Sequence, residues 1–379
     1  MTGFELSAGL AGAPLHAAAH SHHPWPDVSR EAQIRCWDDA ARLLDRKWDY
    51  IFGEVMPKAA RHIARQLALP NPATIAFGPN THSFVLRLLS CFPPGKPIRI
   101  LTTGSEFMSF TRQTARFEED GMAEVTRIPT EPFETFEARF AAAAKGGGHD
   151  LVFFSQAYFD SGFRVRDLKA IVEAVPDKDT LVVIDGYHGF MAVPTDLSAV
   201  AGRAFYLAGG YKFAMSGEGV CFLHCPPGYA PRPRDTGWYA GFSALSGGKP
   251  AVAYGEDGSR FLGATFDVSG LYRFNAVQDW LAREGLTVAT MLEYGRGIER
   301  AFIAALGNDT RIAASQLMVP DESMRARFLA FRTDEAGAIT ADLLKKNVIV
   351  DFRGDRLRFG FGIYHSEDDA RAVAAALAR

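Results

Sequence analysis

The chain has 379 residues, 47% of them hydrophobic, and a formal net charge of −3. This size and composition predict a large buried core divided between two domains. Because the charges are spread along the sequence and form no basic stripe, they argue against nucleic acid as a partner. No apolar run reaches the roughly 18 residues that a membrane span needs, and the N-terminus lacks the basic region of a signal peptide, so we expect a soluble, cytoplasmic protein without a membrane partner.

Cysteine and histidine residues form no metal-binding pattern. The four cysteines, Cys36, Cys91, Cys221 and Cys225, lack the paired spacing of metal ligands, and we expect reduced thiols. The segment HSHHPWP at 20–26 holds three histidines, which leaves metal binding open as an alternative. No acid or cysteine accompanies them, and two prolines force an extended path. We therefore expect no metal site in this chain.

Two helices are expected before the first strand, one starting near Asp27 or Ser29 and one at about 56–68. The first helix has an apolar stripe at helical spacing, formed by Trp37, Ala41, Leu44 and Trp48.

The run TIAF at 74–77 is expected to be a short strand that turns into a helix. The first turn of that helix carries Asn80, Thr81, His82 and Ser83. Their hydroxyls and free backbone N–H groups would suit an anion. Ordinary N-capping by Asn80 or Thr81 explains the same residues equally well.

Apolar runs and helical patterns then alternate along the chain. Strands are expected at 98–104, 123–128, 150–155, 181–185 and 204–208, with helices between most of them. A further run at 219–225 is expected to return beside the last of these strands and pair with it antiparallel. This alternation predicts an α/β fold with a mostly parallel sheet buried on both faces.

Two of these strands end on chemically useful side chains. Asp185 closes the strand at 181–185, with His188 three residues later, and Lys212 follows the next strand after a Gly-Gly break. Ligands of open α/β sheets bind outside the carboxyl ends of the strands. Burial there would lower the pKa of the lysine and favour its nucleophilic neutral form, while the carboxylate could keep a ring nitrogen protonated. Pyridoxal 5'-phosphate requires this pairing; the alternative is a surface lysine and a turn aspartate.

Residues 181–223 resemble the core of the class V aminotransferase superfamily of fold-type-I pyridoxal-phosphate enzymes, and the pieces DGYHG and GGYK are most similar to kynureninases. The resemblance implies a large cofactor-binding domain, with a mostly parallel seven-stranded sheet between helices, and a smaller α+β C-terminal domain. We expect an N-terminal segment and helix at 1–50, the large domain at 51–270 and the small domain at 271–379. The resemblance also implies a homodimer whose subunits share the active site.

The resemblance assigns roles to particular residues. Lys212 would form the Schiff base with the cofactor, Asp185 would bind its pyridinium nitrogen, and His188 would lie beside its oxygen. Among further contacts, Phe107 would stack on the ring and Thr265 would reach the other subunit's phosphate site. The complete set of further cofactor contacts is expected to be Thr81, His82, Ser83, Phe107, Ser161, Tyr211, Trp238 and Thr265. The N-terminal segment 20–26 resembles the opening of kynureninases and would form a loop that reaches the active site.

The closing stretch RLRFGFGIYHSEDD resembles the last signature of the family, in which Arg358 would bind the α-carboxylate of the substrate. An exposed strand arginine is the alternative. We therefore expect an enzyme that acts on a free α-amino acid.

Departures from kynureninases predict an altered specificity. Gly241 stands where they have a histidine, Ala264 and Thr265 where they offer an asparagine, and Phe110 where the family has an acid. A bulky substrate is favoured by aromatic residues expected near the site, namely Phe107, Phe110, Trp238, Tyr239 and Phe242. Transamination, Cβ–Cγ hydrolysis and β-elimination stay open, as does a non-catalytic relative that binds the cofactor. The absence of cysteine after Cys225 argues against a cysteine desulfurase.

Overall fold

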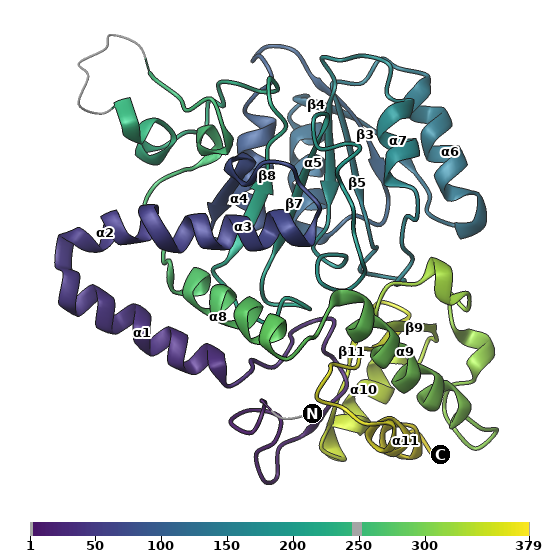
Figure 1. The fold of residues 1–379 in the computed structure, drawn as a ribbon. Helices are drawn as coiled ribbons and strands as arrows, with labels where there is room; N and C mark the ends of the chain where they lie inside the picture. The colour runs from purple at the N-terminus through teal and green to yellow at the C-terminus, as the bar shows by residue number, and fades with distance from the viewer. Residues whose placement is uncertain (1–2, 245–251, 379) are drawn as a thin grey trace.

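A seven-stranded sheet lies at the centre of the protein between layers of helices (Figure 1). The computed structural model describes residues 3–244 and 252–378. The strand order is β2-β8-β7-β6-β5-β3-β4, and only β8 runs antiparallel to its neighbours. This confirms both the mostly parallel sheet and the antiparallel return at 219–225. The strands are β2 (Ile75–Gly78), β3 (Ile98–Thr103), β4 (Ala123–Ile128), β5 (Leu151–Ser155), β6 (Leu181–Asp185), β7 (Ala204–Gly209) and β8 (Cys221–His224).

The central strands are apolar throughout because both faces of the sheet are covered. In β5, Val152 and Phe154 belong to one hydrophobic core, while Leu151 and Phe153 belong to another on the opposite face. Strands β5 and β6 pair in parallel register, which places Ser155 opposite Asp185 at the end of both strands. The two polar side chains therefore reach the same edge of the sheet.

Each face of the sheet has its own helices. The core that contains Phe154 is closed by α3 (Met56–Gln66), α6 (Phe133–Lys145), α7 (Leu168–Ala174) and α8 (Ser269–Arg283). The core that contains Phe153 is closed by α4 (Thr81–Leu89) and α5 (Met108–Glu119). The sheet thus forms the middle layer of a three-layer α/β/α domain.

Helix α1 (Val28–Leu43) and the short α2 (Lys47–Tyr50) form an arm that leads away from the sheet, and α3 returns to it (Figure 1). Most of the apolar stripe expected for this arm is exposed to solvent, although Trp48 is half-buried and packs against Phe52 and Tyr239. Trp37 is 72% exposed and Leu44 is 70% exposed, whereas the buried residues of α1 are Ser29, Ala32 and Asp39. The arm packs on α8 through its small and polar side.

The C-terminal part forms a second unit with its own core. It contains α9 (Val288–Ala304), β9 (Leu329–Arg332), α10 (Ala336–Lys345), β10 (Val348–Ile349), β11 (Asp351–Arg353), β12 (Arg356–Phe359) and α11 (Glu367–Ala376). Strands β11, β12 and β9 form a three-stranded antiparallel sheet. Ahead of β9, Ala314–Gln316 form a 3₁₀ turn, and Leu317 makes an isolated bridge to Phe331.

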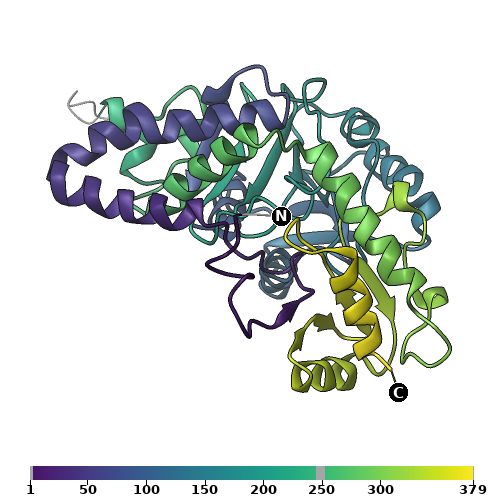
Figure 2. The same ribbon diagram turned by 60° about the horizontal axis from the view of Figure 1, so that its bottom comes forward.

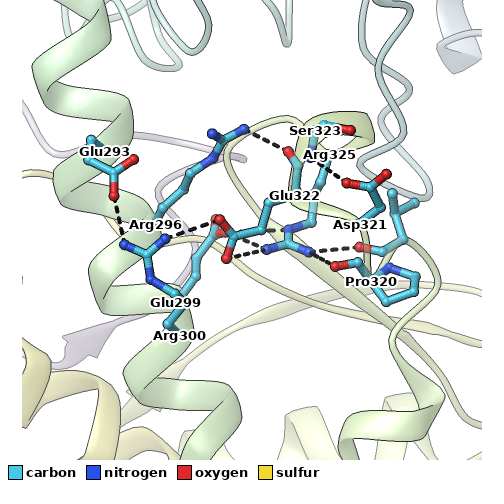
Figure 3. A network of polar contacts seen from close by, with 10 residues as sticks. Glu293, Arg296, Glu299, Arg300, Pro320, Asp321, Glu322, Ser323 and Arg325 are labelled. Atoms are coloured by element: carbon cyan, nitrogen blue, oxygen red, sulfur yellow. Dashed lines mark hydrogen bonds and ion pairs between the residues drawn. The ribbon is translucent and has the colours of Figure 1, made fainter.

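A network of charged side chains fixes α9 to the loop that precedes β9 (Figure 3). Arg325 is almost fully buried and pairs with the equally buried Glu299 at 3.3 Å, while Arg300 joins Glu293 to Glu322. The same loop binds the large domain, since Arg164 Nε donates to the Ser323 carbonyl at 2.9 Å and the Ala326 N–H to that of Gly162 at 2.7 Å. The network therefore anchors the small domain at a turn that follows β5.

The N-terminal strap, residues 15–27, runs between the two parts of the molecule (Figure 2). Its first residues form β1 (Leu15–His16), which pairs with β10 in the small domain, and Ala19 N–H donates to the Gly360 carbonyl at 2.9 Å. Further on, His23 N–H donates to the Tyr211 carbonyl at 3.0 Å. The strap thus connects the small domain to the segment that carries Lys212.

Glycines make room for the strap. A Cβ on Gly360 would lie 2.3 Å from His20 Nδ1, and a Cβ on Gly362 would lie 2.7 Å from His23 Nε2. The glycines of the sequence RFGFG therefore allow two strap histidines to pack directly on the small-domain backbone.

None of the helices in the described ranges is long and apolar enough to cross a bilayer.

Candidate active site

One cavity lies at the carboxyl ends of the central strands, where the sequence places the candidate residues. Asp185 ends β6, Lys212 follows β7, Thr81 begins α4 and Phe107 precedes α5. Parallel strands deliver their carboxyl ends to one edge, which is why residues far apart in the sequence meet there. The lining residues are Thr81, Phe107, Ser155, Ala157, Phe159, Asp185, Tyr187, His188, Tyr211 and Lys212.

Lys212 is a buried amine with few partners. Its side chain is only 6% exposed, and burial, assisted by the charge of Arg358, lowers the pKa of the ammonium group to about 7. Nζ donates one long hydrogen bond, 3.4 Å, to the carbonyl oxygen of His20 in the strap. The rings of Tyr187 and Tyr211 lie 5.6 and 5.2 Å from Nζ. A large fraction of the amine is therefore neutral and nucleophilic near neutral pH.

Asp185 is the carboxyl group of the cavity. Burial raises its pKa to about 6, while the hydrogen bond from Tyr187 N–H, 2.9 Å, and the charge of Lys212 act in the opposite direction. Among the described residues, only the Tyr187 N–H donates to this carboxylate, so one oxygen remains for a ligand. The group is mostly ionised at neutral pH and can stabilise a cation that a ligand brings into the cavity.

The glycines of DGYHG are needed for packing around Asp185. A Cβ on Gly186 would lie 2.0 Å from the hydroxyl of Tyr206, and a Cβ on Gly189 would lie 2.1 Å from Gln156 Oε1. That hydroxyl and that amide are themselves joined by a 2.7 Å hydrogen bond. Larger residues would therefore displace the loop that places Asp185 and His188 at the cavity.

His188 is buried and neutral. Burial lowers its pKa well below the ordinary value, and the charges of Lys212 and Arg358 act in the same direction. Its Nδ1 is buried without a hydrogen-bond partner among the described residues, and its ring lies 5.6 Å from that of Phe328. A neutral imidazole with a free nitrogen is suited to a polar group of a ligand.

Glu106 is a buried acid beneath the cavity that the sequence interpretation missed. It accepts hydrogen bonds from Ser155 Oγ at 2.5 Å and from Thr103 Oγ1 at 2.7 Å, and burial raises its pKa to about 8. Ser155 lines the cavity, so Glu106 controls which way that hydroxyl points. The sequence held one signal for a role of Glu106 near the cavity. This residue lies three positions after Thr103, at the end of β3, and directly before Phe107.

The structure brings six of the expected residues to the cavity: Thr81, Phe107, Asp185, His188, Tyr211 and Lys212. The strap also reaches this cavity, because the His20 carbonyl accepts a hydrogen bond from Lys212 Nζ. The described residues contain no group of three or more His, Cys, Asp or Glu side chains arranged as metal ligands.

Other expected cofactor contacts lie outside this cavity. His82 lines a separate open groove, and Ser83 is bound through N and Oγ by the N-cap Asn80, as the capping alternative predicts. Ser161 Oγ accepts from Phe163 N–H at 3.3 Å within its own turn. Trp238 Nε1 donates to Thr265 Oγ1 at 3.2 Å, and both side chains are exposed.

The expected aromatic surroundings need correction. Phe110 stacks on Phe153 in the core at 3.8 Å between ring centroids, and Tyr239 packs edge-on against Phe52 at 5.0 Å. Neither lines the cavity, and the side chain of Phe242 lies outside the described residues. The aromatic lining comes instead from Phe107, Phe159, Tyr187 and Tyr211.

Arg358 is buried beside the cavity, which excludes the alternative of an exposed strand arginine. It is 2% exposed, and its Nη1 donates to the carbonyl of Phe159, a lining residue. Its Nε donates to Asp351 at 2.8 Å, and Nη2 bonds to the other oxygen of the same carboxylate. The guanidinium therefore already has a bidentate partner within the chain.

Parts of this sequence are similar to known proteins. The family model for the kynureninase C-terminal domain matches residues 296–377. Isopenicillin N epimerase from Streptomyces clavuligerus is 26% identical over 239 residues, covering 61% of this chain and 59% of that protein. The uncharacterized aminotransferase YcbU from Bacillus subtilis (strain 168) is 24% identical over 209 residues, covering 55% and 53%. The matches thus span less than two thirds of either relative.

Solved structures share the whole fold at low identity. The cystine C-S lyase C-DES, in complex with its product cysteine persulfide, superposes with a TM-score of 0.78 at 17% identity, covering 97% of this chain and 98% of that chain. A lysine-to-alanine variant of C-DES has glycine covalently linked to its pyridoxal-phosphate cofactor and superposes with a TM-score of 0.77 at 17% identity, covering 97% of each chain. The cysteine desulfurase CsdA from Escherichia coli gives 0.75 at 16% identity, covering 97% and 94%. Together with the central sheet, these likenesses show that this chain has the fold of C-DES and CsdA, and that its C-terminal part is similar to the C-terminal domain of kynureninases.

Proposed function

We propose that this protein is a pyridoxal-phosphate-dependent enzyme that acts on a free α-amino acid, with Lys212 as the residue that carries the cofactor. The observation that supports this most directly is the buried Lys212, whose pKa is lowered to about 7, in one cavity with Asp185 and His188. Bound pyridoxal phosphate supplies an aldehyde that condenses with amines and a protonated ring that accepts electrons.

The cavity residues fit this cofactor because three of them have incomplete hydrogen bonding. Asp185 has a single backbone donor, His188 Nδ1 has no partner, and Lys212 has one long contact, within the described part of the chain. Asp185 would bind the ring nitrogen, and His188 and Phe107 would contact the ring. Thr81 and Tyr211 offer hydroxyls for the phosphate. A fully apolar cavity, or one whose polar groups were all satisfied, would not support this proposal.

The chain's own residues supply positioning and proton transfer. Lys212, with a pKa near neutrality, can take a proton from the substrate's α-carbon or return one. Asp185 stays ionised beside it and keeps positive charge on the ring nitrogen favourable. The aromatic residues Phe107 and Phe159 and the strap exclude water from these groups.

Arg358 supports a substrate with an α-carboxylate, and the aromatic lining supports a bulky side chain. We propose an architecture like that of kynureninases with a different specificity, because Gly241 and Ala264 lack the ring-binding groups expected there. Efficient turnover of L-kynurenine or 3-hydroxykynurenine would contradict the altered specificity. Product identification on a panel of amino acids would distinguish hydrolysis from transamination, while a non-catalytic relative would bind the cofactor and release no product.

Transfer of sulfur from a substrate to a cysteine of this chain is not favoured. It requires a thiolate, and burial raises the pKa of Cys36 to about 11 and those of Cys91 and Cys221 to about 12. Burial raises the pKa of Cys225 further. All four cysteines are free, in keeping with a reducing compartment such as the cytoplasm.

We also propose a homodimer that shares its active site. Large apolar side chains are exposed on the arm and beside Thr265, with Trp37 at 72%, Leu44 at 70% and Trp238 at 42% exposure. Thr265, hydrogen-bonded to Trp238, would then serve the partner's phosphate site. An active, cofactor-loaded monomer in sedimentation experiments would contradict this.

Borohydride reduction followed by peptide mapping tests the central proposal. We expect a pyridoxyl group on Lys212. Attachment to another lysine, or to none, would overturn the assignment.

A further inference from the structure

One residue of the N-terminal strap contacts both halves of the site. The backbone carbonyl of His20 accepts from Lys212 Nζ at 3.4 Å, and its imidazole Nε2 lies 3.1 Å from Asp351 Oδ1. Asp351 in turn holds Arg358 through both carboxylate oxygens. His20 thus joins the lysine of the large domain to the arginine of the small domain, with its own side chain fully buried.

The direction of the imidazole bond follows from the charges. Although burial opposes ionisation, His20 and Arg358 hold the pKa of Asp351 well below its ordinary range, so this carboxylate only accepts hydrogen bonds. Burial lowers the pKa of His20 to about 4, which keeps the ring neutral. The single ring proton is therefore on Nε2 and is donated to Asp351. Nδ1 faces the Gly360 backbone and has no partner among the described residues.

The ring is also fixed by stacking. His20 lies on Phe328 with 4.6 Å between ring centroids and 16° between planes, and the Arg358 guanidinium carbon is 5.9 Å from the same ring. The imidazole, the carboxylate and the guanidinium are therefore held in one arrangement by side-chain packing as well as by hydrogen bonds.

Asp351 orients Arg358 without using all its donors. A guanidinium has five N–H groups, and three are engaged, two by Asp351 and one by the Phe159 carbonyl. Within the described part of the chain, the other two N–H groups of Arg358 have no partner and would be available to a substrate carboxylate. Their direction depends on Asp351, and the direction of Asp351 depends on His20.

A competing partner shows what His20 prevents. Arg353 Nη2 lies 3.7 Å from Asp351 Oδ2 and its side chain is 45% exposed. If the His20 bond were absent, Asp351 could turn towards Arg353 and release the edge of Arg358 that it now holds.

We propose that His20 is a positioning residue for the substrate's carboxylate: its Nε2–H holds Asp351, which aims the free donors of Arg358. This inference rests on the proposed function, since it assumes that Arg358 meets a carboxylate. It goes further by assigning the N-terminal strap a part in substrate selection.

The test compares two replacements of His20. His20→Phe keeps a ring that can stack on Phe328 but has no N–H, whereas His20→Gln retains an amide N–H that can reach Asp351. Cofactor-loaded proteins are titrated with L-phenylalanine and with phenethylamine, which differ only by the carboxylate, and the dissociation constants are measured by calorimetry.

We expect His20→Phe to bind L-phenylalanine about tenfold more weakly than the parent, the size of one lost hydrogen bond to a charged group. Binding of phenethylamine should change less than about twofold, and His20→Gln should recover most of the loss. The matched control is His62→Phe, which removes a buried histidine 3.2 Å from Asp279 on α3 and α8, away from the cavity. It should shift thermal stability but not the ratio of the two affinities.

Equal weakening of both probes, or no change in either, would overturn the inference. A parent protein that binds L-phenylalanine no better than phenethylamine would also overturn it, because the carboxylate site would then be absent. Failure of the proposed function is recognised separately, since the parent would then carry no pyridoxyl group on Lys212 after borohydride reduction.

Discussion

Two buried arginine–carboxylate pairs in the small domain have the same chemistry and different consequences. Arg325 uses four of its five N–H groups, two for Glu299 and two for the carbonyls of Val319 and Pro320 at 2.8 and 3.1 Å (Figure 3). Arg358 is paired with Asp351, but two of its N–H groups have no partner among residues 3–244 and 252–378, and the strap connects Asp351 to Lys212. A buried arginine of an ion pair can take part in binding when it lies beside a cavity and some of its N–H donors have no partner.

The same contrast predicts which substitutions affect folding and which affect chemistry. Polar groups around the cavity whose hydrogen bonding is incomplete reduce the stability of the free protein. Replacing them should therefore abolish function without unfolding the chain. Substitutions in the buried pair of Arg325 and Glu299 should instead reduce stability and leave the chemistry unchanged.

The largest expected effect is the loss of function in Lys212→Met. Cofactor attachment should disappear and activity should fall by roughly a thousandfold or more, since no other amine lines the cavity. The cofactor-free variant should nevertheless be more stable than the parent at pH 7 to 8, by about 1–3 kcal/mol. Mass spectrometry after borohydride reduction and urea denaturation measure the two effects.

The sign of this stability change follows from proton binding. The pKa of Lys212 is about 7 in the folded chain and about 10.4 when unfolded, so the unfolded chain binds more protons between these values. The penalty of burying the lysine is greatest below pH 7 and declines as the pH rises towards 10. A gain in Lys212→Met that grew with pH would contradict the lowered pKa.

Glu299→Ala should have the largest effect on folding. It leaves the buried Arg325 without its main counter-charge, and we expect a loss of about 3–5 kcal/mol of unfolding free energy. The control Glu293→Ala removes an exposed partner of Arg300 and should change stability by less than about 1 kcal/mol. Protein that remains folded should still attach the cofactor at Lys212. Failure to do so would show that the pair of Arg325 and Glu299 also affects the active site.

Asp185→Asn should retain cofactor and lose activity. A neutral amide cannot stabilise a protonated ring nitrogen, and the expected loss is about 3–4 kcal/mol of transition-state stabilisation, or a hundred- to a thousandfold in kcat/KM. Steady-state kinetics on the best substrate found, with cofactor content measured in parallel, provides the test. Activity within about tenfold of the parent at normal cofactor content would remove this role from Asp185.

Glu106→Gln should change the pH dependence of stability. Its pKa is about 8 in the folded chain and near 4.5 as a free group, so the folded chain binds more protons in this window and the parent loses stability as the pH rises through it. The glutamine variant cannot ionise and should lose less, by about 1.4 kcal/mol for each pKa unit of the shift. Urea denaturation at pH 5 and pH 8 measures the difference, with the exposed Glu119→Gln as control. Parallel pH profiles of parent and Glu106→Gln would show that Glu106 is already ionised in the fold.

The sequence by itself was sufficient to predict the strands of the central sheet and the positions of Asp185 and Lys212 at strand ends. The information is local there: apolar runs long enough for one strand, buried on both faces, end at a carboxylate or at a Gly-Gly break. Thr81, Phe107 and Tyr211, which the family resemblance assigns to the cofactor, also line the cavity.

Aromatic residues were less predictable, because a hydrophobic side chain does not specify which surface it meets. Trp37 and Leu44 have the spacing of a buried stripe and face solvent, while Phe110 was expected at the site and packs in the core. The helical period defines a face of α1, but only the position of α8 decides that the small residues of α1 are the buried ones.

The link between His20, Asp351 and Arg358 was decided only by the tertiary structure. His20 and Asp351 are 331 positions apart, and nothing local in HSHHPWP or in DFR indicates that they meet. Their charge states also depend on burial, which lowers the pKa of His20 to about 4 and makes the ring a neutral donor. Sequence identifies which groups can donate or accept, whereas the desolvation that sets their protonation exists only once the strap is packed between the two domains.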